Sequence, residues 1–153
     1  MRALELKVPP VAQCLLAAGA MWVLAGLVPA AAFGVPAAGW LAGALALAAA
    51  GVGLAAVRHF SAERTTVNPL NPAAATSLVA HGVFRFSRNP MYLALLLALL
   101  AWGAWLGNLA ALVVPVLFVL AMNRLQILPE ERALQAKFGA EYQDYRRRVR
   151  RWI

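Results

Sequence analysis

The chain has 153 residues, a length that predicts a single domain over 1–153, and 63% of its residues are hydrophobic while 13% are charged. Its 14 Lys and Arg residues outnumber its 6 Asp and Glu residues and give a net charge of +8. Because soluble domains typically carry roughly 25% charged residues, this composition excludes intrinsic disorder and argues against a soluble globular enzyme.

Two uncharged runs in the N-terminal part of the chain each have the length of a membrane-spanning helix. A bilayer core needs about 20 mainly apolar residues in a helix. Residues 11–33 carry no charge, with Gln13 as their only amide side chain, and residues 36–57 carry no charge either. We therefore predict the first two spans at about 11–33 and 36–57, with the first retained as a span rather than removed as a signal peptide.

The segment 59–89, which follows the second run, is one of two polar segments that hold the informative residues. Connections longer than about 12–15 residues are usually functional or disordered. Near its end, Asn89-Pro90 is typical of a helix N-cap followed by proline at the first helical position. Arg88 would then lie at the positive end of a helix, where anions bind. The alternative is an arginine that snorkels to the membrane interface.

An uncharged run over 91–122 is too long for one ordinary span and fits two short ones. We place the break at 103–108, where glycines accompany tryptophan, a residue typical of span ends. The third span would cover about 91–106, and the fourth about 109–128. Pro115 predicts a kink in the fourth span.

The C-terminal segment 129–153 is predicted to form an amphipathic helix. Pro129 followed by Glu130 and Glu131 is a typical helix start, and adjacent side chains on a helix point about 100° apart. Apolar residues recur at steps of three or four along one face: Leu134, Phe138, Tyr142, Tyr145, Val149 and Trp152. Arginines crowd the remaining surface, so we expect this segment to dock on anionic lipid headgroups.

The charged residues all lie on one side of a membrane if the chain crosses it four times. They occur before residue 8, between 58 and 88, and after 123. The predicted class is therefore an all-α polytopic integral membrane protein with four transmembrane helices, a C-terminal cytoplasmic amphipathic helix and both termini in the cytoplasm. A bacterial-type inner membrane is the expected location. Because the basic residues coincide with the membrane face, we expect a membrane partner and no nucleic acid.

Two motifs in the polar segments make the sequence recognisable. They are Ser87-Arg88-Asn89-Pro90-Met91-Tyr92 and, about 40 residues later, Glu130-Glu131-x-x-Leu134-x-x-x-Phe138-Gly139-x-x-Tyr142-x-x-Tyr145. In this order and spacing they resemble the isoprenylcysteine carboxyl methyltransferase family and the related phospholipid N-methyltransferases. Asn68-Pro69 and Leu78-Val79-x-x-Gly82 fit the same pattern. The resemblance covers about 65–153, more than half of the chain.

The resemblance implies an integral membrane methyltransferase that uses S-adenosylmethionine without a Rossmann domain. The cofactor would lie at the cytoplasmic ends of the last spans, enclosed by the segments 65–92 and 129–153. The implied cofactor-binding residues come from both segments: His81, Gly82, Arg88, Asn89, Pro90, Tyr92, Glu130, Glu131 and Tyr145. Arg88 and Tyr92 are also the implied catalytic residues, and no metal ligand is implied.

The implied roles match the chemistry of these side chains. Glu130 and Glu131 would hold hydroxyl or amino groups of the cofactor, and Arg88 would hold a carboxylate of the cofactor or the substrate. Tyr92 and Tyr145 would close the pocket. Asn89 stands where the family often has histidine, so it would act through an amide. The expected reaction is methyl transfer to a lipophilic carboxylate, thiol or amine that enters from the bilayer at the cytoplasmic face.

Two other classes of protein remain open. Membrane sterol reductases, which use NADPH, also resemble this region through an Arg-Pro-Tyr helix start, although Met91-Tyr92-Leu93 and the Glu-Glu helix favour the methyltransferase. A non-enzymatic membrane protein that binds lipid or a partner is the second alternative. It predicts that Arg88, Glu130 and Glu131 do not converge in the fold.

Overall fold

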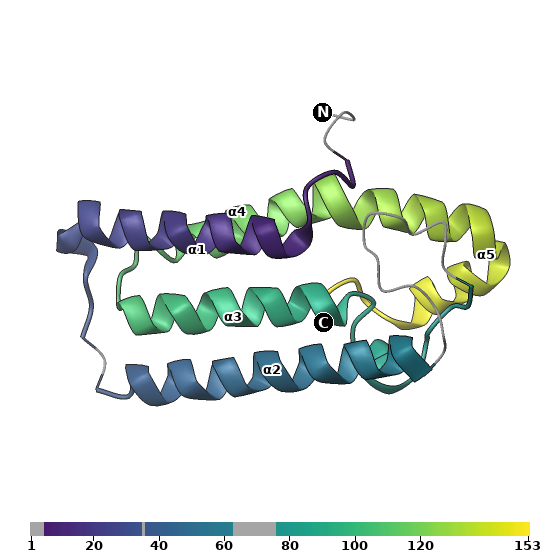
Figure 1. Cartoon of the computed structure of the whole chain (residues 1–153), viewed down its shortest axis with the longest axis horizontal. Coiled ribbons are helices and arrows are strands. Elements are labelled where there is room, and N and C mark those ends of the chain that lie inside the picture. Colours follow the sequence, from purple (N-terminus) through teal and green to yellow (C-terminus); the bar gives the residue numbers. More distant parts are fainter. Residues whose placement is uncertain (1–4, 35, 63–75) are drawn as a thin grey trace.

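The computed structural model describes residues 5–34, 36–62 and 76–153, which form a bundle of helices (Figure 1). The long helices are α1 (Pro10–Leu27), α2 (Ala38–Ala62), α3 (Pro90–Leu106), α4 (Val113–Met122) and α5 (Leu128–Arg148). The short elements are the 3-10 turns η2 (Pro29–Ala31) and η4 (Gly82–Arg85) and the π-helical segment η5 (Asn123–Ile127). In the described ranges the only extended pairing is an isolated bridge between Ala32 and Asn108. The predicted all-α class is confirmed.

Three helices are long and apolar enough to cross a membrane. They are α1, the Ala38–His59 part of α2, and the continuous helix Val113–Arg148 that contains α4, η5 and α5. The fourth apolar helix, α3, has 17 residues, and at 1.5 Å per residue it extends about 25 Å, slightly less than the hydrocarbon core of a bilayer. Large apolar side chains such as Trp40, 86% exposed, lie on the outside, where lipid would cover them. The predicted class of polytopic membrane protein is therefore confirmed, with three helices long enough to span and α3 as a shorter apolar helix.

The break between the third and fourth spans falls where we predicted it. Helix α3 ends at Leu106, and Gly107 adopts a left-handed conformation with φ of 58°. The buried Asn108 side chain then holds the turn, because its Oδ1 accepts hydrogen bonds from the backbone N–H groups of Ala110 and Ala111 at 2.9 and 3.2 Å. Its Nδ2 also donates to the carbonyl oxygen of Val28 at 2.8 Å and so ties this turn to the end of α1.

The fourth span differs from the prediction in its start and in its irregularity. The turn after Asn108 delays α4 until Val113, so Pro115 falls in the first turn of the helix. Proline is tolerated there because the N–H group that it lacks would have no partner within the helix. The kink that we predicted at Pro115 is therefore wrong. The irregular part of this helix is instead the π-helical segment η5, just before Glu130 and Glu131.

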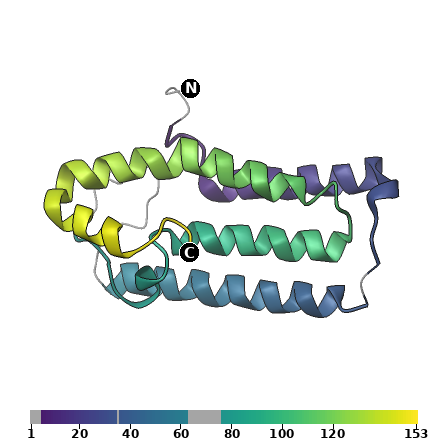
Figure 2. The same ribbon diagram turned by 180° about the vertical axis from the view of Figure 1, so that it is seen from behind.

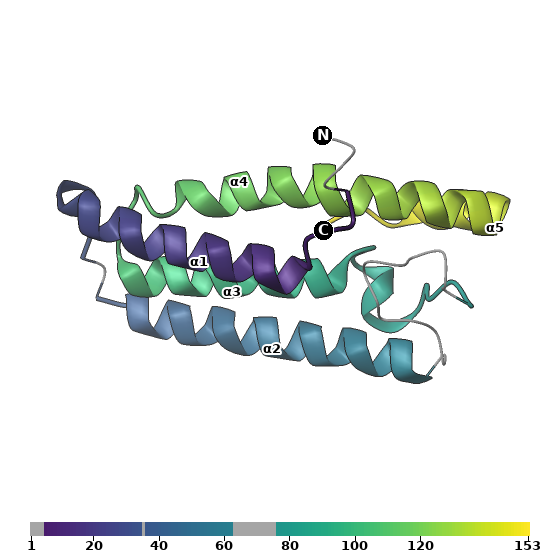
Figure 3. The same cartoon turned by 45° about the horizontal axis from the view of Figure 1, so that its top comes forward.

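Helix α3 lies at the centre of the bundle, with α2 on one side and α1 and α4 on the other (Figure 3). Buried side chains of α1, α3, α4 and the flanking turns form one apolar cluster: Cys14, Met21, Tyr92, Leu99, Ala111, Val114, Phe118, Met122 and Ile127. On the other side, an added Cβ at Gly53 of α2 would lie 3.4 Å from Cβ of Ala94 in α3. Small residues therefore let α2 approach α3 closely.

Helix α5 reverses its direction near its middle, which we did not predict. Gly139 has φ of 51° and ψ of −118°, and the chain turns back there toward the start of α3 (Figures 1 and 2). The predicted apolar stripe is present, but the protein itself covers it. Tyr142 and Tyr145, 2% and 4% exposed, pack in a cluster with Ala56 and Phe84. The opposite face of this segment, which carries most of its arginines together with Glu141 and Asp144, remains exposed.

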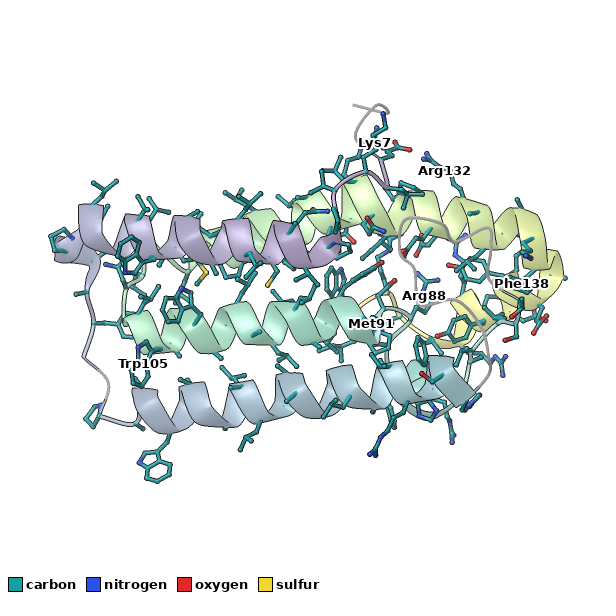
Figure 4. All side chains as sticks on the ribbon, viewed as in Figure 1. Lys7, Arg88, Met91, Trp105, Arg132 and Phe138 are labelled. Carbon is teal, nitrogen blue, oxygen red and sulfur yellow. The ribbon has the colours of Figure 1, made fainter. Side chains whose placement is uncertain are left out.

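Both ends of the described chain lie at the end of the bundle that carries α5. The N–H group of Leu6 donates to the carbonyl oxygen of Leu125 at 3.0 Å, and Glu5 forms ion pairs with Arg124 and Arg132 of the α4–α5 helix. Figure 4 shows Lys7 and Arg132 at this end, whereas Trp105 lies at the opposite end. This arrangement fits an even number of membrane crossings.

Candidate functional site

The two motifs meet at the end of the bundle where α3 and α5 begin. Arg88 directly precedes the N-cap of α3, and its Nη2 lies 2.8 Å from Oε1 of Glu131 in the first turn of α5. The two side chains are 9% and 8% exposed. Figure 4 shows Arg88 in the space between α3 and α5. Residues that are 43 positions apart in the sequence therefore form a buried ion pair.

A second arginine binds the same carboxylate from the C-terminal tail. Arg151 donates from Nε to Oε1 of Glu131 at 3.0 Å and from Nη2 to Oε2 at 2.7 Å. This hydrogen bonding with Glu131 raises the pKa of Arg151. Bidentate pairs of this kind are strong and directional, and two arginines compensate for the burial of one carboxylate. We missed Arg151 in the sequence, because nothing there distinguishes it from the neighbouring arginines that we assigned to lipid headgroups.

Glu130 points to a different set of partners. Its Oε1 accepts a hydrogen bond from the Tyr92 hydroxyl at 2.5 Å and another from Nε2 of Gln126 at 3.0 Å. The carboxylates of Glu130 and Glu131 therefore point to different partners, as expected for adjacent residues of a helix. Glu130 follows the exposed Arg124 in the sequence and so lies outside the apolar part of the helix. Burial raises the pKa of its carboxyl group to about 7. The hydrogen bonds from Tyr92 and Gln126 lower it in part. Gln126 was not among the predicted site residues.

The C-terminal tail lies along the residues that precede α3. The N–H group of Arg88 donates to the carbonyl oxygen of Arg150 at 3.0 Å, and Nδ2 of Asn89 donates to the carbonyl oxygen of Arg151 at 2.9 Å. Asn89 occupies the N-cap position as predicted, with Pro90 next to it, but its side chain makes no capping hydrogen bond. The amide of Asn89 therefore holds the tail, and through the tail it holds Arg151 near Glu131.

The remaining predicted cofactor contacts lie around the short turn η4. The Tyr145 hydroxyl donates to the carbonyl oxygen of Phe84 at 2.8 Å and so joins η4 to α5; burial raises the pKa of Tyr145. The rings of His81 and His59 are 5.1 Å apart. Gly82 has φ of 59°, and an added Cβ there would collide with the His59 ring. The structure therefore places His81 and Gly82 against the end of α2.

Part of the first predicted cofactor segment lies outside the described residues. Residues 65–75, which include Asn68-Pro69, belong to this part.

Among the described residues, no group of three or more His, Cys, Asp and Glu side chains could hold a metal ion.

An open pocket adjoins the buried ion pair. Its volume is about 560 Å³, within the range of ligand sites, and it is lined by Arg88, Gln135, Gln143, Arg146 and Arg147. The Nε atom of Arg88 is buried and has no hydrogen-bond partner among the described residues. A guanidinium group with a free donor fits the carboxylate of an amino-acid cofactor such as S-adenosylmethionine. Arg88 therefore fits the carboxylate of that cofactor, whereas Glu130 is not among the residues that line this pocket.

The fold and this site define a polytopic helical membrane protein with a charged, buried site at one end. Residues 37–141 match the family described as "Phospholipid methyltransferase". The match covers more than half of the chain and includes both Arg88 and the two glutamates, so the chain belongs to the phospholipid methyltransferase family. Methyltransferases generally use S-adenosylmethionine as the methyl donor.

A curated relative from Haemophilus influenzae (strain ATCC 51907 / DSM 11121 / KW20 / Rd) is also similar. It is described as "Uncharacterized protein" and is 52% identical over 63 residues, which are 41% of this chain and 100% of that protein. No solved structure matches the chain. The family assignment therefore rests on the sequence match.

Proposed function

We propose that this chain transfers a methyl group from S-adenosylmethionine to a lipophilic acceptor, a carboxylate, thiol or amine, at the cytoplasmic face of the membrane. The observation that carries the proposal is the buried Arg88–Glu131 pair, through which the two family motifs converge beside a pocket. The charged residues that the structure describes and both ends of the described chain lie at the same end of the bundle (Figure 4). The positive-inside rule favours the cytoplasm for that end.

The residues of this site would bind and align the reactants. The cofactor, when bound, supplies a reactive methyl group on a sulfonium centre. Arg88 has a free Nε for a carboxylate, and Glu130 has a carboxyl group that can hold an ammonium or hydroxyl group. Tyr92 orients Glu130, while Glu131 and Arg151 hold Arg88 in place. Alignment of two reactants can lower a barrier by about 7–11 kcal/mol.

The other predicted contacts keep supporting roles in this proposal. Asn89 and Pro90 would set the start of α3, and Tyr145, His81 and Gly82 would shape the wall formed by η4. The apolar part of the acceptor would enter sideways between the helices from the bilayer. An amine acceptor must lose a proton before transfer, and Glu130, with a pKa near 7, is suited to accept it. A carboxylate or thiol acceptor needs no strong base.

The test is a transfer assay with methyl-labelled S-adenosylmethionine and the protein in lipid nanodiscs. The acceptors are a panel of lipophilic acids, thiols and amino-lipids. We expect label in at least one acceptor, a loss of about 10-fold or more for Glu131→Gln, and no change for Glu141→Gln, an exposed acid on the same helix. Specific binding of NADPH without binding of S-adenosylmethionine would instead support a reductase. Binding of lipid without binding of either cofactor would support a non-enzymatic protein.

A further inference from the structure

The π-helical segment η5 determines the direction in which Glu130 and Glu131 point. A π-helical turn contains one residue more than an α-helical turn. Because each residue of an α-helix turns the chain by about 100°, one extra residue rotates the side chains that follow it by about that angle relative to α4. Glu130 lies three residues after the end of η5 at Ile127. The contacts of the two acids with Tyr92 and Arg88 therefore depend on this irregular turn.

Pro129 leaves a gap in the hydrogen bonding of this helix. In a regular α-helix the carbonyl oxygen of Leu125 would accept a hydrogen bond from the N–H group four residues later. That residue is Pro129, which has no N–H group and whose ring clashes with the carbonyl group. The N–H group of Leu6 donates to the same oxygen at 3.0 Å. The N-terminal arm, defined here as residues 5–9, therefore supplies the donor that Pro129 lacks, and it lies across the junction of α4 and α5 (Figures 1 and 3).

The backbone of Leu6 shows that the contacts of the arm are specific. Its φ is 57°, in the left-handed region that residues with a Cβ rarely occupy. In the part of the chain that the structure describes, it is the only residue other than glycine with a positive φ. Such a conformation persists only where the surrounding contacts determine the backbone. The contacts with η5 therefore outweigh its cost.

Glu5 adds two ion pairs that span the irregular segment. Its carboxylate pairs with Nη1 of Arg124 at 3.1 Å and also with Arg132, and its side chain is 11% exposed. Arg124 belongs to η5, and Arg132 directly follows Glu131. One largely buried carboxylate thus joins both ends of the segment 124–132, which contains the two acids of the site. Two guanidinium partners restrain this segment more than one exposed pair would.

We infer that the N-terminal arm is a positioning element of the candidate site, which holds η5 in the register that directs Glu130 and Glu131 into that site. The arm acts through η5, so Glu5 and Leu6 are positioning residues rather than catalytic ones. This positioning role deepens the proposed function and rests on it, because Glu130 and Glu131 are the acids assigned there to the cofactor and to Arg88.

The test follows the local opening of η5 by hydrogen exchange, which requires no ligand, with the full chain in nanodiscs. The variant is Glu5→Gln, which removes the charge and keeps the size of the side chain. The matched control is Glu141→Gln, the same change at an exposed acid of α5. We expect the backbone amides of 124–132 to exchange at least about threefold faster in Glu5→Gln than in the wild type or the control. Exchange in α1 and α2 and the midpoint of thermal unfolding should not change.

Two further measurements connect the arm to its partner and to the site. Arg132→Gln alone should also speed exchange in 124–132, and its effect combined with Glu5→Gln should be smaller than the sum of the two, because both changes remove the same ion pair. Calorimetry should then show S-adenosylmethionine binding to Glu5→Gln at least about threefold more weakly than to the wild type. Its binding to Glu141→Gln should equal that of the wild type.

Unchanged exchange of 124–132 in Glu5→Gln would overturn the proposed role of the arm. Faster exchange in every helix with a lower unfolding midpoint would also overturn it, because the arm would then stabilise the whole bundle. Faster local exchange with unchanged binding of S-adenosylmethionine would contradict a role in positioning the site. If the wild type itself binds no S-adenosylmethionine, the proposed function fails, and the exchange comparison still decides whether the arm holds η5.

Discussion

At the residue scale, Glu130 and Glu131 are neighbours in the sequence and have opposite surroundings in the fold. Glu131 is held by two arginines, Arg88 and Arg151, and its burial is therefore compensated by charge. The hydrogen bonds described for Glu130 come from neutral groups, the Tyr92 hydroxyl and the Gln126 amide. The buried carboxyl of Glu130 consequently holds its proton more tightly. One residue of the pair organises the site, and the other is available to a ligand.

This difference predicts a pH dependence of stability that Glu130 controls. The folded-state pKa of Glu130 is raised from 4.5 to about 7. Its contribution to stability is therefore fully present below about pH 4.5 and is lost as the pH rises through about 7. Glu130→Gln keeps an acceptor for Tyr92 but cannot titrate. In denaturant unfolding, we expect the free energy of unfolding of the wild type to fall by on the order of 3 kcal/mol relative to that of the variant as the pH rises from 4.5 to about 7. Parallel stability curves for the two proteins would contradict this prediction.

At the element scale, α5 determines the shape of the site more than any other helix. Its first turn carries Glu130 and Glu131, and its reversal at Gly139 brings the second arm and the tail back over the start of α3. Tyr145 then joins this arm to η4 through the carbonyl oxygen of Phe84. A straight helix with the same sequence would carry Arg151 away from Glu131.

Gly139→Ala tests the reversal of α5. The φ of 51° and ψ of −118° at this position are unfavourable for a residue with a Cβ, while no atom lies within 4 Å of an added Cβ. The cost of the change therefore comes from the backbone, at about 1–3 kcal/mol. We expect a lower midpoint of thermal unfolding and faster proteolysis of the segment after residue 139.

Gly51→Ala in α2 is the matched control for this prediction. It also adds a Cβ with nothing within 4 Å, but it does so in a regular helix, where alanine is favoured over glycine by up to about 1 kcal/mol. The control should leave stability unchanged or raise it. Equal stability of Gly139→Ala and the wild type would show that the reversal does not need glycine.

At the scale of the whole molecule, the sequence predicted what depends on composition and local pattern. The four apolar segments, the break at 103–108 and the N-cap position of Asn89 all follow from hydropathy and from the preferences of glycine, asparagine and proline. The convergence of Arg88 with Glu131 could be expected from the family resemblance. The reversal at Gly139 and the pairing of Arg151 could not, because both depend on contacts between segments that are distant in the sequence.

The proposed methyl transfer requires that the end of the bundle around Arg88, Glu130 and Glu131 binds S-adenosylmethionine. Calorimetry of S-adenosylmethionine binding to the full chain in nanodiscs tests it most directly, with Glu130→Gln, Glu131→Gln and the exposed control Glu141→Gln. We expect saturable binding to the wild type and to the control, and binding that is weaker by about 10-fold or more in each of the other two variants. Unchanged binding by both Glu130→Gln and Glu131→Gln would contradict it.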